Sequence, residues 1–155
     1  MEQLGYEERD IILVGRSMGS GPACEMASLF SNVSALVLIS PYTSLKAATK
    51  SFLGSIASML VRERFDNLTA IQSVKCQTLI IHGQKDTLIP ESHALELYSK
   101  CGGPSKLIMP EKMTHNEYDI YNDLVKPINE FLGETGVVAT SSYSVQVKQV
   151  HWSMT

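Results

Sequence analysis

Four short, mainly apolar runs recur along the chain, and they predict the strands of one buried sheet. The runs lie at 11–14, 35–39, 78–81 and 106–109 and are rich in Ile, Leu and Val. Because polar residues do not alternate with apolar ones, both faces of each predicted strand should be covered. The pattern therefore favours an internal sheet over one with a solvated face.

Segments with helical spacing separate these runs. Pro22, which is well tolerated in the first turn of a helix, is followed by apolar residues at intervals of three and four. Asp66 or Asn67 can cap a short helix, and Pro127 should kink or split the last one. The predicted helical segments are 22–30, 45–61, 67–71, 91–100 and 116–132.

The alternation of strands and helices predicts how the sheet is built. Strand–helix–strand units of this length imply right-handed crossovers and a parallel sheet with helices on both faces. In such sheets the ligand site lies at the carboxyl ends of the strands. Four chemically useful residues closely follow predicted strand ends, namely Ser17, Tyr42, Asp86 and His115. We therefore expect these four residues on one rim of the sheet.

The first predicted strand runs directly into Gly15-Arg16-Ser17-Met18-Gly19, which has the pattern Gly-x-Ser-x-Gly. A strand, a sharp turn and a helix form the context of a nucleophile elbow, in which a strained serine projects from the sheet. Side chains at Gly15 and Gly19 would be expected to collide with the adjoining strand and helix. A glycine-rich turn can also bind phosphate at a helix N-terminus. However, Ser20 stands where a P-loop needs its second glycine, so that alternative has little support.

Composition limits the classes of function. The 155 residues suffice for one domain, with 44% hydrophobic and 19% charged residues. The net charge of −3 and the absence of a basic cluster argue against a nucleic-acid partner. Three widely spaced cysteines predict reduced thiols and a cytoplasmic location. The four histidines form no metal-binding motif, so we expect no metal and no cofactor.

Ser17, Asp86 and His115 follow one another in the order used by one class of serine hydrolases. The intervals are 86 − 17 = 69 and 115 − 86 = 29 residues. Serine needs a neighbouring base, histidine titrates near neutrality, and a buried carboxylate fixes the histidine tautomer. Each residue also has an ordinary alternative, because Asp86 suits a turn and His115 suits a helix cap. His82 is expected to be a structural group beside the third strand.

Two further histidines, His93 within a predicted helix and His151 near the C-terminus, are expected to be solvated.

Longer stretches around these residues resemble the α/β-hydrolase superfamily. They are ILVGRSMGSGPA, IIHGQKDTLIP and Thr-His-Asn, with Ser-Pro-Tyr-Thr-Ser and Asp-Asn between them. Within the superfamily they are most similar to the Bem46-like proteins and the protein-depalmitoylating branch. The resemblance implies that Ser17 is the nucleophile, Asp86 the acid and His115 the base, with the backbone N–H of Met18 in the oxyanion hole. It also implies a small-molecule or lipid-acylated substrate and association with a membrane surface.

The resemblance covers only part of the family's fold. A full α/β-hydrolase has roughly eight strands, and this chain is predicted to carry the last four. We therefore expect a partial α/β-hydrolase domain over 1–133, with about four parallel strands and helices on both faces, followed by a loose tail over 134–155. The first strand would then be an exposed apolar edge, which is a template for pairing with another chain.

These observations lead to one preferred function and two alternatives. The preferred function is hydrolysis of carboxylic esters or acyl thioesters through an acyl-enzyme on Ser17. One alternative is a truncated half-hydrolase that acts as a binding or assembly module, and the other is a serine peptidase. Tyr42, Leu88 and Ile89 are candidates for contact with the substrate, although apolar residues at these positions also suit a core.

Overall fold

The computed structural model of the chain describes residues 5–49 and 65–137, and within them lies one four-stranded parallel sheet. The strands follow the chain in the order β1-β2-β3-β4. Each predicted apolar run coincides with a strand to within two residues. The strands are β1 (Ile12–Arg16), β2 (Ala35–Ile39), β3 (Gln77–Ile81) and β4 (Ser105–Ile108).

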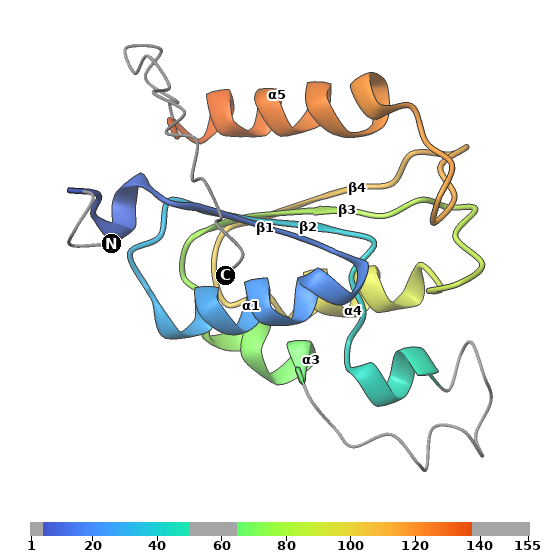
Figure 1. Cartoon of the computed structure of the whole chain (residues 1–155), viewed down its shortest axis with the longest axis horizontal. Coiled ribbons are helices and arrows are strands. Elements are labelled where there is room, and N and C mark those ends of the chain that lie inside the picture. Colours follow the sequence, from blue (N-terminus) through green and yellow to red (C-terminus); the bar gives the residue numbers. More distant parts are fainter. Residues whose placement is uncertain (1–4, 50–64, 138–155) are drawn as a thin grey trace, which may run out of the picture.

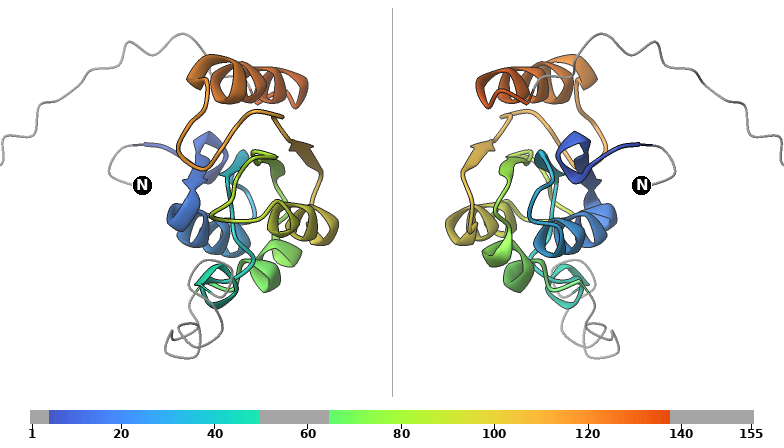
Figure 2. Two further views of the ribbon diagram at one scale, coloured as in Figure 1. Left: turned by 90° about the vertical axis from the view of Figure 1, so that its right-hand side faces the viewer. Right: turned by 90° about the vertical axis from the view of Figure 1, so that its left-hand side faces the viewer.

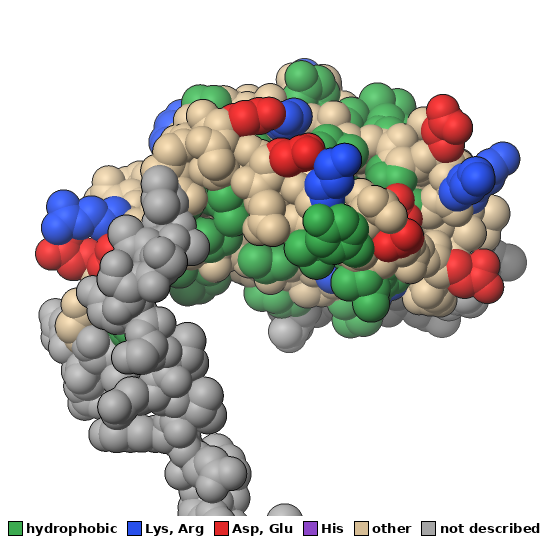
Figure 3. Space-filling view, turned by 90° about the horizontal axis from the view of Figure 1, so that it is seen from above, with side chains coloured by type: hydrophobic (Ala, Val, Ile, Leu, Met, Phe, Trp, Pro, Cys, Tyr) green, Lys and Arg blue, Asp and Glu red, His purple; other side chains and the backbone are tan. Residues whose placement is uncertain are grey.

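Helices cover both faces of this sheet, as the alternating pattern predicted. On one face lie α1 (Ser20–Leu29), α3 (Asn67–Ala70) and α4 (Ser92–Lys100), whereas α5 (Lys126–Glu134) covers the other face (Figures 1 and 2). The prediction of about four parallel strands with helices on both faces is therefore confirmed. The outer surface on the α5 side carries acidic, basic and apolar side chains side by side (Figure 3).

Successive residues of a strand point to opposite faces, so the sheet separates two apolar cores. All five residues of β2 are buried, as an unbroken apolar run predicts. Leu36 and Leu38 pack with α1 and α4, whereas Val37 and Ile39 pack with Phe131 of α5. This double burial fixes the register of the strands, and the register brings their carboxyl ends to one rim.

Two helix boundaries depend on local side-chain bonds. Asp66 caps α3 by accepting a hydrogen bond from the backbone N–H of Thr69 at 3.1 Å, as predicted. The prediction of a helix from 116 is wrong at its start, because the first turn begins at the π-helix η5 (Ile120–Val125) after the cap Asp119. Pro127 splits the segment as expected, since it lies in the first turn of α5, where a missing N–H costs little.

Strand β1 lies at an edge of the sheet within the described residues. The side chain of Val14 is 59% exposed, whereas its register partner Val37 on β2 is fully buried. The predicted exposure of an apolar first strand is therefore present in this part of the chain. A long apolar edge is a site for pairing with another strand.

Part of the predicted helical segment over 45–61 and most of the predicted tail over 134–155 lie outside the described residues. Residues 45–49 are helical, and α5 ends at Glu134, where the tail was predicted to begin. Among the helices that the structure describes, none has the length and apolar character needed to cross a bilayer.

Candidate active site

Ser17 lies at a sharp turn between β1 and α1. The turn is the short 3₁₀ segment η3 (Ser17–Gly19), and Ser17 has a φ of 51°, in the left-handed region that non-glycine residues rarely adopt. The hydroxyl of Ser20 donates a hydrogen bond to the backbone oxygen of Ser17 at 2.6 Å. The strained turn that the Gly-x-Ser-x-Gly pattern predicted is therefore present.

The two glycines of this turn behave differently. A Cβ atom at Gly15 would lie 2.5 Å from the backbone oxygen of Gly19 and 2.7 Å from the Cβ atom of Ala23. The predicted collision is therefore confirmed at Gly15. At Gly19 it is wrong, because nothing lies within 4 Å of a Cβ atom there. A side chain at Gly19 would therefore extend into open space.

A continuous chain of hydrogen bonds joins Ser17 to two residues from other strand ends. The Nε2 atom of His115 lies 2.9 Å from the Oγ atom of Ser17, and its Nδ1 atom lies 2.7 Å from the Oδ2 atom of Asp86. Asp86 is 6% exposed and His115 is 7% exposed. The structure thus brings together the three residues that the sequence order singled out, although 98 positions separate the serine from the histidine.

Asp86 has a second set of partners in its own loop. Its Oδ1 atom accepts hydrogen bonds from the backbone N–H groups of Leu88 at 3.0 Å and Ile89 at 2.9 Å. Asp86 therefore stabilises a turn through its Oδ1 atom, as the alternative predicted. Its Oδ2 atom is hydrogen-bonded to His115. The alternative of His115 as a helix cap is wrong, because η5 is capped by Asp119.

Two more histidines are buried near these residues. The Nε2 atom of His82 lies 2.8 Å from the backbone oxygen of Ile89, which agrees with a structural role beside β3. His93 is 8% exposed, so the expectation that it is solvated is wrong. Its Nδ1 atom accepts a hydrogen bond from the backbone N–H of Thr43 at 3.2 Å, and this bond fastens α4 to the loop after β2. His151 lies outside the described residues.

We expect the protein to lose stability as the pH falls below about 6.5. Burial lowers the pKa of both His82 and His93, so the folded protein keeps them neutral where the unfolded chain binds protons. The loss begins near the unfolded pKa and ends at the lowered folded value, with a slope of at most about 1.4 kcal/mol per pH unit for each histidine. Urea unfolding between pH 7.5 and 5 measures this slope.

A His93→Gln variant should flatten the pH dependence of the unfolding free energy, because one of the two buried groups is then absent. An unchanged slope in this variant would contradict the assignment.

The residues predicted to contact substrate or to form the oxyanion hole differ in exposure. Met18, predicted for the oxyanion hole, is 70% exposed next to Ser17, whereas Tyr42 is 1% exposed and Ile89 is 5% exposed. The hydroxyl of Tyr42 points to the backbone oxygen of Met18, at 3.4 Å, so this side chain supports the elbow from inside. Leu88 is partly exposed. Contact of Tyr42, Leu88 and Ile89 with a substrate, and the oxyanion role of Met18, stay predictions.

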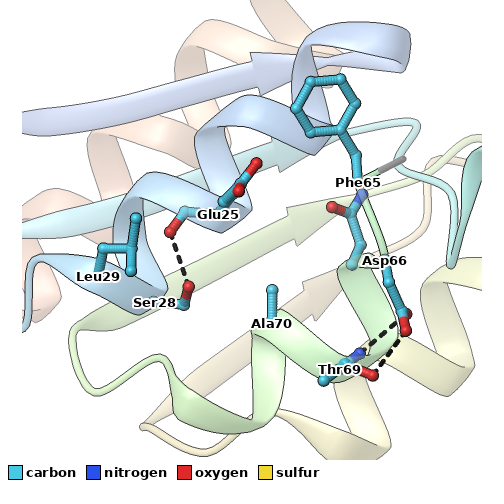
Figure 4. A pocket seen from close by; sticks show the side chains of 8 residues that line it. Glu25, Ser28, Leu29, Phe65, Asp66, Thr69 and Ala70 are labelled. Carbon is cyan, nitrogen blue, oxygen red and sulfur yellow. Dashed lines mark hydrogen bonds between the residues drawn. The ribbon is translucent and has the colours of Figure 1, made fainter. Parts of the chain in front are cut away.

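A groove of about 320 Å³ lies between α1 and α3 (Figure 4). Three of its polar side chains bond locally, since both carboxylate oxygens of Asp66 accept hydrogen bonds from Thr69, and Ser28 donates one to the backbone of Glu25. A second hollow of about 430 Å³ lies beside Glu7–Arg9 and Asn32. Ser17 lines neither hollow, so both are separate from the turn at Ser17–Gly19.

Burial makes the Cys24 thiol of α1 a poor nucleophile. Cys24 and Cys76 are buried and Cys101 is partly buried, and all three are unpaired. Burial raises the pKa of the Cys24 thiol to about 12, which keeps this thiol protonated at neutral pH. Reactivity toward an electrophile at neutral pH is therefore expected from the strand-end serine and not from Cys24.

Sequence reasoning missed one residue at this rim. The guanidinium of Arg16 donates a hydrogen bond to the backbone oxygen of His115 and lies over the ring of Tyr118, 5.3 Å from its centroid. Arg16 belongs to the motif that the sequence singled out, but a motif gives no sign of which loop its second position will reach.

Comparison with protein families places these residues in a known group. The family model described as serine hydrolase (FSH1) matches residues 11–134, which include Ser17, Asp86 and His115. Alpha/beta hydrolase domain-containing protein 17B of Homo sapiens is 26% identical over 130 residues, covering 84% of this chain and 44% of that protein. Alpha/beta hydrolase domain-containing protein aho-3 of Caenorhabditis elegans is 28% identical, covering 84% of this chain and 38% of that protein.

Solved structures show the same fold. Acetyl xylan esterase 1 from Thermoanaerobacterium sp. JW/SL YS485 superposes with a TM-score of 0.64 at 19% identity, over 83% of this chain and 46% of that one. The acylaminoacyl peptidase of Pyrococcus horikoshii has a TM-score of 0.70 at 15% identity, over 90% of this chain and 26% of that one. The superfamily prediction made from the motifs is confirmed, and the chain spans less than half the length of each of these relatives.

Proposed function

We propose that this chain, which belongs to the serine hydrolase (FSH1) family, carries the machinery of an acyl-ester or acyl-thioester hydrolase with Ser17 as its nucleophile. The observation that carries the proposal is the pair of hydrogen bonds that His115 makes, with Ser17 at 2.9 Å and with Asp86 at 2.7 Å. A nucleophile, a base and a group that orients the base are the three parts that acyl transfer to serine requires.

Hydrogen-bonding chemistry supports a direction for each proton. A carboxylate only accepts hydrogen bonds, so the Nδ1 atom of His115 carries its proton and donates it to Asp86. The Nε2 atom then has a free lone pair that accepts a hydrogen bond from the Ser17 hydroxyl. When the Ser17 oxygen attacks the acyl carbon, His115 takes the hydroxyl proton and Asp86 stabilises the resulting imidazolium.

The second half of the reaction releases the acid. The tetrahedral intermediate collapses, the bond from the acyl carbon to the leaving oxygen or sulfur breaks, and the leaving group takes the proton from His115. Water then attacks the acyl-enzyme and gives its proton to His115, after which the acid leaves and Ser17 regains its proton. We assign the backbone N–H of Met18 as one oxyanion donor. Each such donor contributes about 10²–10³-fold to the rate.

Resemblance supports an acyl chain as the substrate's reacting part. The motifs resemble the protein-depalmitoylating branch, and apolar side chains are accessible at Met18, next to Ser17, and partly accessible at Leu88, in the loop of Asp86. We therefore propose a small acyl ester or a lipid-acylated thioester as the substrate class, and a cytoplasmic location for the protein. A lipid-acylated substrate would bring the protein to a membrane surface.

The test is labelling with a fluorophosphonate probe followed by intact-mass measurement and peptide mapping. We expect one adduct per chain, on the peptide that contains Ser17, with the Ser17→Ala variant as the blank. Circular dichroism establishes that both proteins are folded. An equal adduct on the Ser17→Ala variant, or a folded protein without any adduct, would contradict the proposal. Turnover of acyl esters and acyl thioesters of matched chain length would then separate the two substrate classes.

The exposed edge of β1 favours a second candidate, a binding or assembly module that pairs with another strand. Val14 is 59% exposed on this edge, next to a strand whose residues are all buried. If two copies pair through β1, we expect a dimer that Val14→Lys converts to a monomer, because an inserted charge opposes edge pairing. Light scattering measures the mass. A parent protein that is monomeric at high concentration would contradict pairing between copies.

A further inference from the structure

We propose that Arg16 is a positioning residue that holds the loop of His115 against the nucleophile turn. The proposal rests on the proposed function, because it concerns how the base of that site is placed. Arg16 is the last residue of β1 and precedes Ser17 directly. Because Arg16 and Ser17 are adjacent, a contact between Arg16 and the loop of His115 also fixes that loop relative to Ser17.

The guanidinium of Arg16 touches three residues of that loop. Its Nη2 atom donates a hydrogen bond to the backbone oxygen of His115 and lies 3.4 Å from the Oδ1 atom of Asn116. Its Cζ atom lies over the ring of Tyr118, 5.3 Å from the centroid, where a cation is attracted to the ring face. One side chain thus binds the backbone of the base and two of the next three residues.

The topology explains why such a link is needed. His115 follows β4, which lies at the opposite edge of the described sheet from β1. The near end of the loop is fastened beside β3, because the backbone N–H of Lys85 donates to the oxygen of Met113 at 3.1 Å. From there the loop must reach over the rim to Ser17, and no strand pairing can hold it there. Arg16 supplies a hydrogen bond at that far end.

The burial of one guanidinium nitrogen also favours a positioning role. The Nε atom of Arg16 is buried and has no hydrogen-bond partner among the described residues. A buried N–H without a partner is unfavourable, so a side chain that only filled space would be better replaced by an apolar one. The contacts of the Nη2 atom and of the planar guanidinium face compensate for this cost. A lysine in the same place would provide a charge but no planar group to stack on Tyr118.

The Arg16 contact affects both the distance from His115 to Ser17 and the distance from His115 to Asp86. His115 must lie within hydrogen-bond reach of Ser17 and of Asp86, and both distances depend on where its backbone is held. A displacement of about 1 Å in a reacting group costs about 10²-fold in rate. Loss of the Arg16 contact should therefore slow the chemical step while leaving the binding of a probe unchanged.

The first experiment measures inactivation of the full chain by a fluorophosphonate, with the rate constant and the probe affinity determined separately. We expect Arg16→Gln to lower the inactivation rate constant by about 10²-fold and to leave the probe affinity unchanged. Arg16→Lys should recover part of the rate, because an ammonium can still donate to the oxygen of His115. Arg9→Gln makes the same chemical change at an arginine whose side chain is 74% exposed and is the matched control, with an unchanged rate. Arg16→Gln at the parent rate overturns the proposal.

The second experiment needs no activity. In a Ser17→Ala background, proton NMR follows the Nδ1–H of His115, which is protected only while His115 and Asp86 stay paired. We expect this signal in the Arg16 parent and its broadening or loss in Arg16→Gln, with urea unfolding showing that both proteins are folded. An identical signal in the two proteins overturns the proposal. If the parent binds no probe but the signal depends on Arg16, the proposed function fails and the positioning role stands.

Discussion

Asp86→Asn is expected to lower the rate of acyl transfer to Ser17 by about 10⁴-fold while leaving the protein folded. The orientation of the new amide is fixed by the loop. The backbone N–H groups of Leu88 and Ile89 both point at the Oδ1 position, so an asparagine must place its oxygen there. Its NH₂ group then faces His115 and donates to the Nδ1 atom. This forces the proton of His115 onto the Nε2 atom, which can no longer accept the hydroxyl proton of Ser17.

The measurement is turnover of a chromogenic acyl ester or, for slow variants, the rate of fluorophosphonate labelling. Asp66→Asn is the matched control, because it makes the same chemical change at a helix cap and asparagine caps helices as well as aspartate does. The control should keep the parent rate and stability. A loss of less than about 10-fold in Asp86→Asn would show that the amide oxygen does not occupy the Oδ1 position.

Gly15→Ala is expected to destabilise the protein by about 1–3 kcal/mol and to displace the nucleophile turn. The added methyl group would lie 2.5 Å from the backbone oxygen of Gly19, 2.7 Å from the Cβ atom of Ala23 and 2.8 Å from the Cα atom of Ser20. None of these atoms is the end of a flexible side chain, so the start of α1 must move away from β1. Because Ser17 lies between them, its labelling rate should fall by about 10²-fold as well.

Gly19→Ala provides the control from within the same motif. A Cβ atom at Gly19 meets nothing within 4 Å, and its φ of −67° is one that alanine adopts readily. We expect a change in the unfolding free energy within about 0.5 kcal/mol. Urea unfolding compares the two variants directly. Equal destabilisation by both substitutions would mean that glycine is needed for flexibility and not for close approach.

Much of the fold could be predicted because the sheet is buried on both faces. Continuous apolar runs mark such strands clearly, and each predicted run lies within two residues of a strand. The rim location of Ser17, Asp86 and His115 followed from the strand ends alone, since parallel strands place their carboxyl ends together. From the order of the three residues along the chain we could also predict the role of each one.

The remaining features depend on contacts between distant parts of the chain. His93 has the polar character of a surface residue, and only the approach of the Thr43 backbone makes its burial favourable. The Gly-x-Ser-x-Gly pattern treats its two glycines alike, whereas the structure crowds Gly15 and leaves Gly19 open. The hydrogen bond from Arg16 to the backbone oxygen of His115 joins residues 99 positions apart, and no local sequence pattern predicts a contact over that separation.

The arrangement of the strands has a consequence for when the three residues of the candidate site come together. Neighbouring strands in the sheet are also neighbours along the chain, and each parallel pair requires a crossover that closes a long loop before its contacts form. Ser17 follows β1, whereas His115 follows β4 at the opposite edge of the described sheet. We therefore expect Ser17 and His115 to come within hydrogen-bond distance only after all four described strands have paired.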